Sequence, residues 1–245
     1  MRPDASKKLA AAAPKAGRNP VVIGAVVAVL VILAVVVAIL MGGNDKPGGP
    51  GGSALPSGVV GGKDAGIVAN AATAKSNAPT LDIYEDFQCP GCGDLEKRVG
   101  TAVTSLAKAG DVKVVLHILS FLDGNLKNDS STRSANATAC AADAGKVLEY
   151  HSAVFAAQPS QEGVGFTDAQ LTDFATTSGI AGDALTTWQK CTSSGQHAQY
   201  VTDVQTGAEK AGVFSTPTVK LDGKDITKSL TSPAELIAQV KAATK

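Results

Sequence analysis

Two cysteines two residues apart, placed between a predicted strand and a predicted helix, constrain the fold of this chain more than any other feature. The motif is Cys89-Pro90-Gly91-Cys92. If the pair opens a helix, the Cys89 sulfur lies near unpaired backbone N–H groups and the positive end of the helix dipole, which stabilise a thiolate. A stabilised thiolate is a good leaving group, so a disulfide between these cysteines would pass readily to other proteins. The motif therefore predicts thiol–disulfide exchange, with Cys89 exchanging and Cys92 resolving.

The segments on either side of the motif predict an α/β sheet. Residues 80–87 alternate Leu81, Ile83 and Phe87 with polar side chains and end at the cysteines, which favours a central strand. Apolar residues then recur at helical spacing from Leu95 to Leu106, and residues 111–119 form a second β run. Because a helix separates the two strands, they are expected to be parallel, as in other α/β sheets.

The C-terminal half predicts a helical insertion followed by a hairpin and a last helix. Residues from 128 to about 212 are Ala-rich, and their apolar side chains recur every three or four residues, as in helices. Gly and Pro residues interrupt this pattern. Two short β runs then flank Asp222-Gly223, which is a strong hairpin signal. Ser232-Pro233 is typical of a helix start, so the terminal helix is expected from 234 to about 243.

The N-terminal region predicts a membrane anchor. Residues 21–41 contain no charged or polar side chain and would span roughly 30 Å as a helix, the thickness of a bilayer's hydrocarbon core. Five basic residues and one acid precede them, so residues 1–20 are expected to be a cytoplasmic tail and everything after residue 41 to lie outside. The alternative is a cleaved signal peptide, but the apolar run is longer than usual and no clear small-x-small site follows.

Residues 42–62 are rich in Gly and Pro and predict a flexible linker, which leaves residues 63–245 for one domain. The chain has 22 basic and 22 acidic residues, so nothing suggests binding to nucleic acid.

All four cysteines follow the apolar segment, which fits two disulfides and an oxidising compartment. Cys140 and Cys191 are open to two interpretations, a structural disulfide or a second redox pair. Neither has a near neighbour or opens a helix, which favours the structural disulfide.

Three segments together resemble the DsbA family of thiol–disulfide oxidoreductases, in a membrane-anchored form like those of actinobacteria. They are Asp86-Phe87-Gln88-Cys89-Pro90-Gly91-Cys92, Ala139-Cys140-Ala141-Ala142 leading to Tyr150 and Phe155, and Gly212-Val213-Phe214-Ser215-Thr216-Pro217-Thr218-Val219. The resemblance implies a thioredoxin fold with a helical insertion, preceded by one transmembrane helix. It also implies that Pro217 is a cis-proline facing the cysteines, that the Thr216 backbone pairs with substrate, and that Pro90 and Gly91 support the active site.

By this resemblance, the chain is expected to be a single-pass protein of the cell membrane that introduces disulfides into exported proteins. A quinone-linked membrane partner similar to DsbB or VKOR would reoxidise it, and we expect a monomer with no bound cofactor. A zinc site is not expected, because no second close pair of cysteines or adjacent histidine accompanies Cys89 and Cys92. Two alternatives stay open: a reductase or isomerase of the same compartment, and a redox-inert binding module or chaperone.

Two departures from the family pattern affect the expected chemistry. Thioredoxin-like enzymes often carry a buried acid six residues before the first cysteine, where this chain has Ile83, so proton transfer to Cys92 would need Glu85, Asp86 or water. The Pro-Gly dipeptide also lacks the histidine of strongly oxidising relatives, which predicts a milder oxidant. His117 and His151 have no recognisable partner and are interpreted as packed or surface residues, and Trp188 as core.

Overall fold

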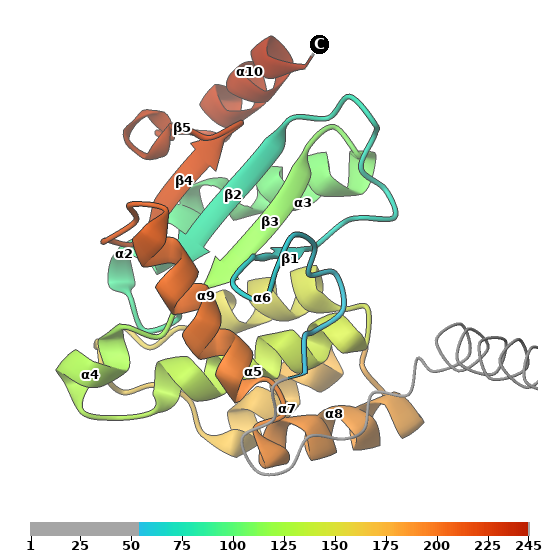
Figure 1. The fold of residues 1–245 in the computed structure, drawn as a ribbon, viewed down its shortest axis with the longest axis vertical. Coiled ribbons are helices and arrows are strands. Elements are labelled where there is room, and N and C mark those ends of the chain that lie inside the picture. The colour runs from blue at the N-terminus through green and yellow to red at the C-terminus, as the bar shows by residue number, and fades with distance from the viewer. Residues whose placement is uncertain (1–53, 245) are drawn as a thin grey trace, which may run out of the picture. The chain divides into compact units, whose positions relative to one another are not determined.

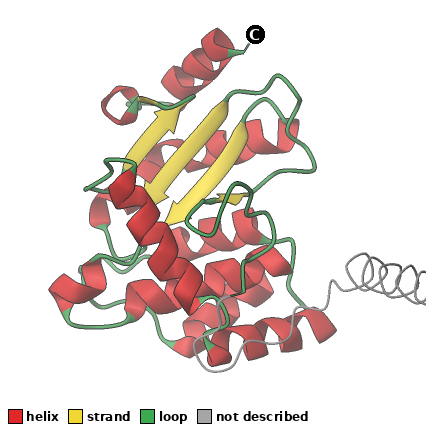
Figure 2. Cartoon of the chain, in the orientation of Figure 1, coloured by secondary structure: helices red, strands yellow, loops and turns green. Residues whose placement is uncertain are grey.

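The computed structural model describes residues 54–244, which form a five-stranded mixed sheet and two groups of helices (Figures 1 and 2). The predicted tail (1–20), the predicted anchor (21–41) and residues 42–53 of the predicted linker lie outside this range. Within residues 54–244, no helix is both long and apolar enough to cross a membrane. The membrane anchor therefore stays a prediction.

The sheet has the order β1-β3-β2-β4-β5, with β2 at its centre as predicted. Its strands are β1 (Ile67–Val68), β2 (Thr80–Glu85), β3 (Lys113–Ile118), β4 (Thr218–Leu221) and β5 (Lys224–Asp225). β2 runs parallel to β3 and antiparallel to β4, so that Ile83 lies opposite Leu116 on one side and Val219 on the other. β1 pairs with β3 and β5 with β4, both antiparallel. The β2–helix–β3 connection gives the parallel pair that the sequence predicts.

The helix after the cysteines is more complex than the single amphipathic helix that the sequence predicts. It consists of α2 (Pro90–Leu95), a π-helical turn η1 (Glu96–Gly100) and α3 (Thr101–Ala109), and it ends at Gly110, whose φ is 73°. The apolar spacing could not distinguish these turns, because Leu95, Val99 and Val103 are buried through all three segments. π-Helical turns are rare inside helices and frequently lie at functional sites.

The predicted helical insertion is present, begins at Leu122 and not at residue 128, and is organised around one helix. It comprises α4 (Leu122–Leu126), α5 (Ser130–Asp143), α6 (Val147–Ala156), α7 (Asp168–Thr177), α8 (Gly182–Ser194) and α9 (Ala198–Lys210). α5 contacts α4, α6, α7, α8 and α9. Its buried side chains are mostly Ala, Ser and Thr, which let neighbouring helices approach closely. α9 crosses the sheet in front and contacts β3, whereas α3 lies behind the sheet (Figure 1).

The C-terminal elements follow their predicted local signals. Asp222 and Gly223 have φ values of 46° and 79°, which is the conformation that an Asp-Gly hairpin turn requires. A 3₁₀ turn, η2 (Thr227–Ser229), leads to α10 (Pro233–Ala243). The Ser232 hydroxyl accepts a hydrogen bond from the Glu235 N–H at 3.2 Å and caps α10, which packs against α3.

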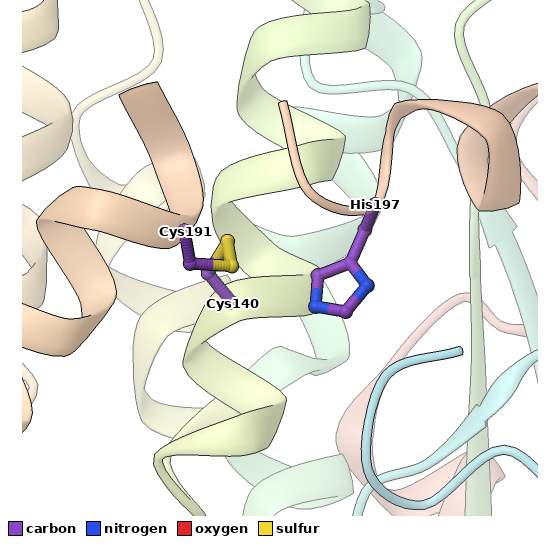
Figure 3. A group of neighbouring side chains, drawn as sticks. All are labelled: Cys140, Cys191 and His197. Carbon is purple, nitrogen blue, oxygen red and sulfur yellow. A yellow bond between two sulfur atoms is a disulfide. The ribbon is translucent and has the colours of Figure 1, made fainter. Parts of the chain in front are cut away.

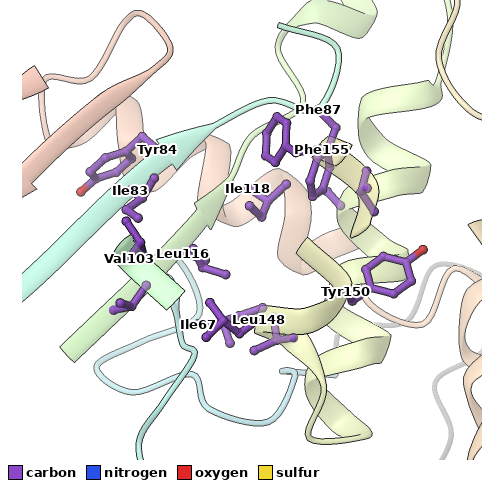
Figure 4. Close-up of a cluster of buried hydrophobic side chains, with 14 of the residues drawn as sticks. Ile67, Ile83, Tyr84, Phe87, Val103, Leu116, Ile118, Leu148, Tyr150 and Phe155 are labelled. Carbon is purple, nitrogen blue, oxygen red and sulfur yellow. The ribbon is translucent and has the colours of Figure 1, made fainter. Parts of the chain in front are cut away.

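One continuous core connects the sheet with the helical insertion (Figure 4). Ile83 and Leu116 contribute from the sheet, and Val103 contributes from α3. Phe87 and Phe155 join this group to α6, with ring centroids 4.8 Å apart. Burying side chains of this size stabilises a fold by about 1.5–3 kcal/mol each. The loop that holds the cysteines is therefore anchored in the same core as the sheet.

The packed domain begins before the predicted boundary at residue 63. Pro56 is buried, Val59 forms an isolated β-bridge with Ile67, and the Ser57 N–H donates to Asp143 Oδ1 at 2.8 Å. These contacts explain why residues 54–62 lie against the domain although their composition favours a linker. β1 was not predicted, because two residues are too few to show a period.

Candidate active site

The end of β2 and the start of α2 place Cys89 and Cys92 in different environments. Cys89 caps α2 with an extended backbone (φ −78°, ψ 117°), and Pro90 occupies the first turn, where its missing N–H costs no hydrogen bond. Both thiols are free. Cys92 is fully buried, whereas Cys89 is partly exposed. Only Cys89 is therefore open to a second protein.

The two sulfurs differ in acidity in the direction that thiol exchange requires. A hydrogen bond from the Cys92 thiol lowers the pKa of Cys89 to about 6, and the N–H groups of Cys92 and Gly91 contribute, against an opposing effect of burial. Burial, followed by the hydrogen bond to Cys89 and the charge of Glu85, raises the pKa of Cys92 far above its ordinary value. Cys89 is thus the stable thiolate and Cys92 the protonated thiol near neutral pH.

The rate of alkylation of reduced Cys89 by iodoacetamide is expected to rise with pH through a midpoint near 6, against an ordinary thiol value of 9.0. Because this pKa lies below the unfolded value, ionisation of Cys89 stabilises the reduced fold fully above about pH 9 and progressively less as the pH falls to about 6. Mass spectrometry of the alkylated peptide checks the profile. Cys92 is the internal control and should stay unmodified, and a Cys89 midpoint above pH 8 would contradict the assignment.

The loop before β4 lies against the cysteines. The Thr216–Pro217 peptide bond is cis, and the Cys89 thiol donates to the Thr216 carbonyl with an S···O distance of 3.5 Å. A Cβ placed on Gly91 would lie 3.3 Å from Pro217 Cδ and 3.7 Å from Cys89 Sγ, so glycine permits this close approach. Pro90, Gly91, Thr216 and Pro217, which the resemblance assigns to the active site, thus lie together around Cys89. Phe214, in the same loop, is 80% exposed.

The comparisons with known proteins agree with this geometry. The family model described as Thioredoxin matches residues 70–242. The chain belongs to the thioredoxin family. Reduced DsbA from Mycobacterium tuberculosis is 28% identical with a TM-score of 0.60, over 74% of this chain and 92% of that one. MdbA, a thiol–disulfide oxidoreductase from Corynebacterium diphtheriae, is 26% identical with a TM-score of 0.61, over 80% and 96%.

Oxidised BdbD from Bacillus subtilis has the same fold. It is 20% identical to this chain with a TM-score of 0.59, over 79% of this chain and 98% of that one. No match was found among curated protein sequences. With the DsbA and MdbA likeness, these findings establish a DsbA-like thiol–disulfide oxidoreductase. The expected enzyme class is confirmed, which separates this member of the thioredoxin family from redox-inert binding modules.

Two polar groups that sequence reasoning missed attach the cysteine loop of this DsbA-like enzyme to the helical insertion. The Gln158 amide donates to the carbonyls of Phe87 and Cys89 at 2.8 and 2.9 Å. The Gln88 amide nitrogen lies 2.9 Å from Asp123, Asn128 and Ser131 oxygens. Gln158 is 69 residues from Cys89 in the chain, and no local pattern singles it out.

Asp86 has a structural environment. Its Oδ1 accepts from the Gln88 N–H at 2.9 Å and from the Ser131 hydroxyl at 2.6 Å, and its Oδ2 accepts from the Leu122 N–H at 3.2 Å. Burial raises the pKa of Asp86 to about 6 despite these hydrogen bonds. Because both oxygens are engaged in holding the loop, Asp86 is poorly placed to exchange a proton with Cys92.

His151 is packed, as interpreted from the sequence, but it has a partner that the sequence did not reveal. Its Nε2 lies 2.9 Å from Glu85 Oε2, and both side chains are buried. Glu85 is two positions after Ile83 on β2, so it lies on the same face of the strand as the position where relatives carry an acid. Burial, with the nearby Cys89 charge, raises the pKa of Glu85 well above its ordinary value. The pair could not be predicted because the partners are 66 residues apart.

His117 and Trp188 are packed, as interpreted from the sequence, although His117, like His151, has an acidic partner that the sequence did not reveal. His117 stacks on Tyr84 with centroids 4.0 Å apart, and its Nε2 lies 3.0 Å from Asp82 Oδ1. The Trp188 indole N–H donates to the Ala137 carbonyl at 3.1 Å, and its ring lies 5.7 Å from that of Tyr150. Neither side chain belongs to the environment of the free cysteines.

Cys140 of α5 and Cys191 of α8 are joined in a disulfide within the helical insertion. His197 lies beside it (Figure 3), and one of its ring nitrogens lies within 4.8 Å of both sulfurs. His197 Nδ1 is 2.8 Å from the Ala54 carbonyl and its Nε2 is 2.8 Å from Asp143 Oδ2. Since the sulfurs are bonded to each other and both ring nitrogens are engaged, this group is organised as a structural cross-link.

Proposed function

We propose that this enzyme introduces disulfides into exported proteins by exchange at Cys89 and Cys92. The observation that carries the proposal is the asymmetry of the pair: Cys89 is accessible and has a pKa near 6, whereas Cys92 is buried and has a strongly raised pKa. A stabilised Cys89 thiolate favours the reduced enzyme, so the oxidised enzyme tends to give its disulfide away.

The reaction has two exchange steps. A substrate thiolate attacks the Cys89 sulfur, the Cys89–Cys92 bond breaks, and Cys92 leaves and takes up a proton because its pKa is high. A second substrate thiolate then attacks the substrate sulfur bound to Cys89, which forms the substrate disulfide and releases Cys89 as a thiolate. Two electrons have passed from the substrate thiols to the enzyme pair.

Protein substrates are favoured by the surface beside Cys89. Phe214 exposes most of its ring, and the edge of the cis-proline loop borders an open hollow of about 790 Å³ lined by Ser215, Pro217 and Thr218 together with residues of β5, η2 and α10. An extended substrate segment can place an apolar side chain near Phe214 and its backbone along Thr216. These features give a protein more contact area than a small thiol could use.

The proposed location follows from the apolar segment at residues 21–41 and the basic residues before it. We propose a single-pass anchor with the catalytic domain outside the cytoplasm, where a quinone-linked membrane partner similar to DsbB or VKOR reoxidises Cys89 and Cys92. The Gly/Pro-rich residues that follow would keep the domain near that partner. Alkaline extraction of membranes tests this: release of the intact chain into the soluble fraction would contradict an anchor.

The equilibrium reduction potential of the Cys89–Cys92 pair tests the direction of the reaction. The full-length chain, poised in glutathione buffers and trapped with a thiol reagent, is expected to give a value between about −120 and −180 mV, as for oxidases and isomerases. The Pro-Gly dipeptide, which predicts a milder oxidant, favours a potential near the more negative end of that range. A potential near −270 mV, similar to that of thioredoxin, would instead assign a reductase.

A further inference from the structure

Gln158 connects the helical insertion to the main chain that carries Cys89. It lies two residues after the end of α6, and its backbone N–H donates to the Phe155 carbonyl at 3.1 Å, which fixes where the side chain starts. The side-chain Nε2 donates to the Phe87 carbonyl at 2.8 Å and to the Cys89 carbonyl at 2.9 Å. Because a glutamine amide has two hydrogens to donate, both are used on the turn between β2 and α2.

The two acceptor carbonyls determine where Cys89 lies. The Cys89 carbonyl also accepts from the N–H groups of Cys92 at 3.1 Å and of Gly93 at 3.3 Å, so it is the group at which the hydrogen bonds of α2 begin. The Phe87 carbonyl lies two residues earlier, before the chain enters the helix. By binding both carbonyls, Gln158 fixes the Cys89 main chain relative to the first turn of α2, which carries Cys92.

A glycine in α2 makes room for the Gln158 amide. A Cβ placed on Gly93 would lie 1.9 Å from Gln158 Oε1 and 2.9 Å from its Cδ, so a larger residue would collide with the amide. Gly93 is buried in a helix, where alanine has the better propensity, and its φ is not positive. The close approach of Gln158, and not the backbone conformation, therefore explains the glycine that follows the second cysteine.

Two other contacts between the insertion and this turn act on side chains. The Phe87 ring packs against Phe155 of α6, and the Gln88 amide binds polar side chains of α4 and α5. The Gln158 amide instead binds the main chain on which the Cys89 sulfur is mounted. Closure of the cysteine disulfide is an intramolecular step, so its rate depends on how constantly the two sulfurs are held within reach of each other.

We propose that Gln158 is a positioning residue for disulfide exchange, because it holds the Cys89 main chain where Cys92 can reach the Cys89 sulfur. The inference rests on the proposed exchange at these cysteines. In the closure step the Cys92 sulfur attacks the Cys89 sulfur of a mixed disulfide, the Cys89–Cys92 bond forms, and the bond to the other sulfur breaks. The cysteine pair is oxidised and the departing sulfur is reduced, and the proton of Cys92 ends on that sulfur by way of solvent. Gln158 exchanges neither electrons nor a proton and acts through the position of Cys89.

The test separates the intermolecular step from the closure step. The reduced full-length chain in detergent is mixed with oxidised glutathione, trapped at intervals with a thiol reagent, and resolved by mass into reduced, mixed-disulfide and closed forms. Formation of the mixed disulfide depends on the glutathione concentration, whereas closure does not. Gln158→Ala is expected to slow closure about tenfold and to change mixed-disulfide formation less than about twofold, since a misplacement of about 1 Å can cost about 10²-fold in rate.

Gly93 allows a double-mutant cycle that separates positioning from a general loosening of the fold. Gly93→Ala should slow closure by a similar factor, because the added methyl group displaces the Gln158 amide although alanine favours the helix. Gly93→Ala combined with Gln158→Ala should close no more slowly than Gln158→Ala alone, because both changes remove the same contact. Gln161→Ala is the matched control: it replaces an exposed glutamine between α6 and α7 and should close at the wild-type rate.

Three results would overturn the positioning role. They are wild-type closure in Gln158→Ala, equal slowing of both steps in that variant, and factors that multiply when Gly93→Ala is added to it. A wild-type chain that forms the mixed disulfide and never closes would refute the proposed exchange at Cys89 and Cys92, and the positioning role with it. A reduction potential typical of a reductase would refute only the proposed direction, because closure is measured whichever way the enzyme runs.

Discussion

Replacement of Cys92 by alanine is expected to stop turnover and to leave Cys89 joined to substrate. Cys89 keeps its accessible sulfur and its position at the start of α2, so a substrate disulfide can still react with it. No buried thiol is then present to expel the substrate, and the mixed disulfide accumulates. Non-reducing gel electrophoresis after acid trapping in cells checks this outcome, with turnover expected to fall to the uncatalysed rate.

Cys89→Ala is the matched control for that experiment. It should lose turnover equally and form no mixed disulfide, because the Cys92 sulfur is fully buried. Mixed disulfides formed through Cys92 in this variant, or normal turnover in either one, would contradict the assignment of the two roles. The comparison needs no purified partner and separates the exchanging sulfur from the resolving one.

Removal of the Cys140–Cys191 disulfide is expected to reduce stability while leaving the chemistry intact. The cross-link closes a loop of 51 residues between α5 and α8, which corresponds to about 4 kcal/mol in the chain-entropy model. The double variant Cys140→Ala with Cys191→Ala should lose about that much free energy of unfolding in urea titrations. Its Cys89–Cys92 reduction potential should match that of the unmodified chain.

The outcome of this experiment distinguishes the two interpretations of Cys140 and Cys191. A variant with normal stability but lost activity would mean that they form a second redox pair. The structure supports the stabilising role, because the disulfide lies in the packed core of the insertion next to His197 (Figure 3) and far along the chain from either free thiol.

Local patterns were sufficient for most of the fold. The alternation in residues 80–87 identified the central strand, Asp222-Gly223 identified the hairpin, and Ser232-Pro233 identified the start of α10. Each of these signals involves only a few neighbouring residues. It can therefore be recognised in the sequence without knowing which element packs against it. The π-helical turn η1 was not recognised, because apolar spacing is compatible with both helix types.

The sequence by itself determined the chemistry: two cysteines at helix-opening spacing after a strand, and a proline loop that resembles one family. Only the tertiary structure decided which polar groups from other elements are buried near the pair. Glu85 and His151 come from β2 and α6, and Gln158 from the residue that follows α6 by two positions. A hydrogen bond between residues 66 apart leaves no local pattern, because it depends on how the helical insertion packs against the sheet.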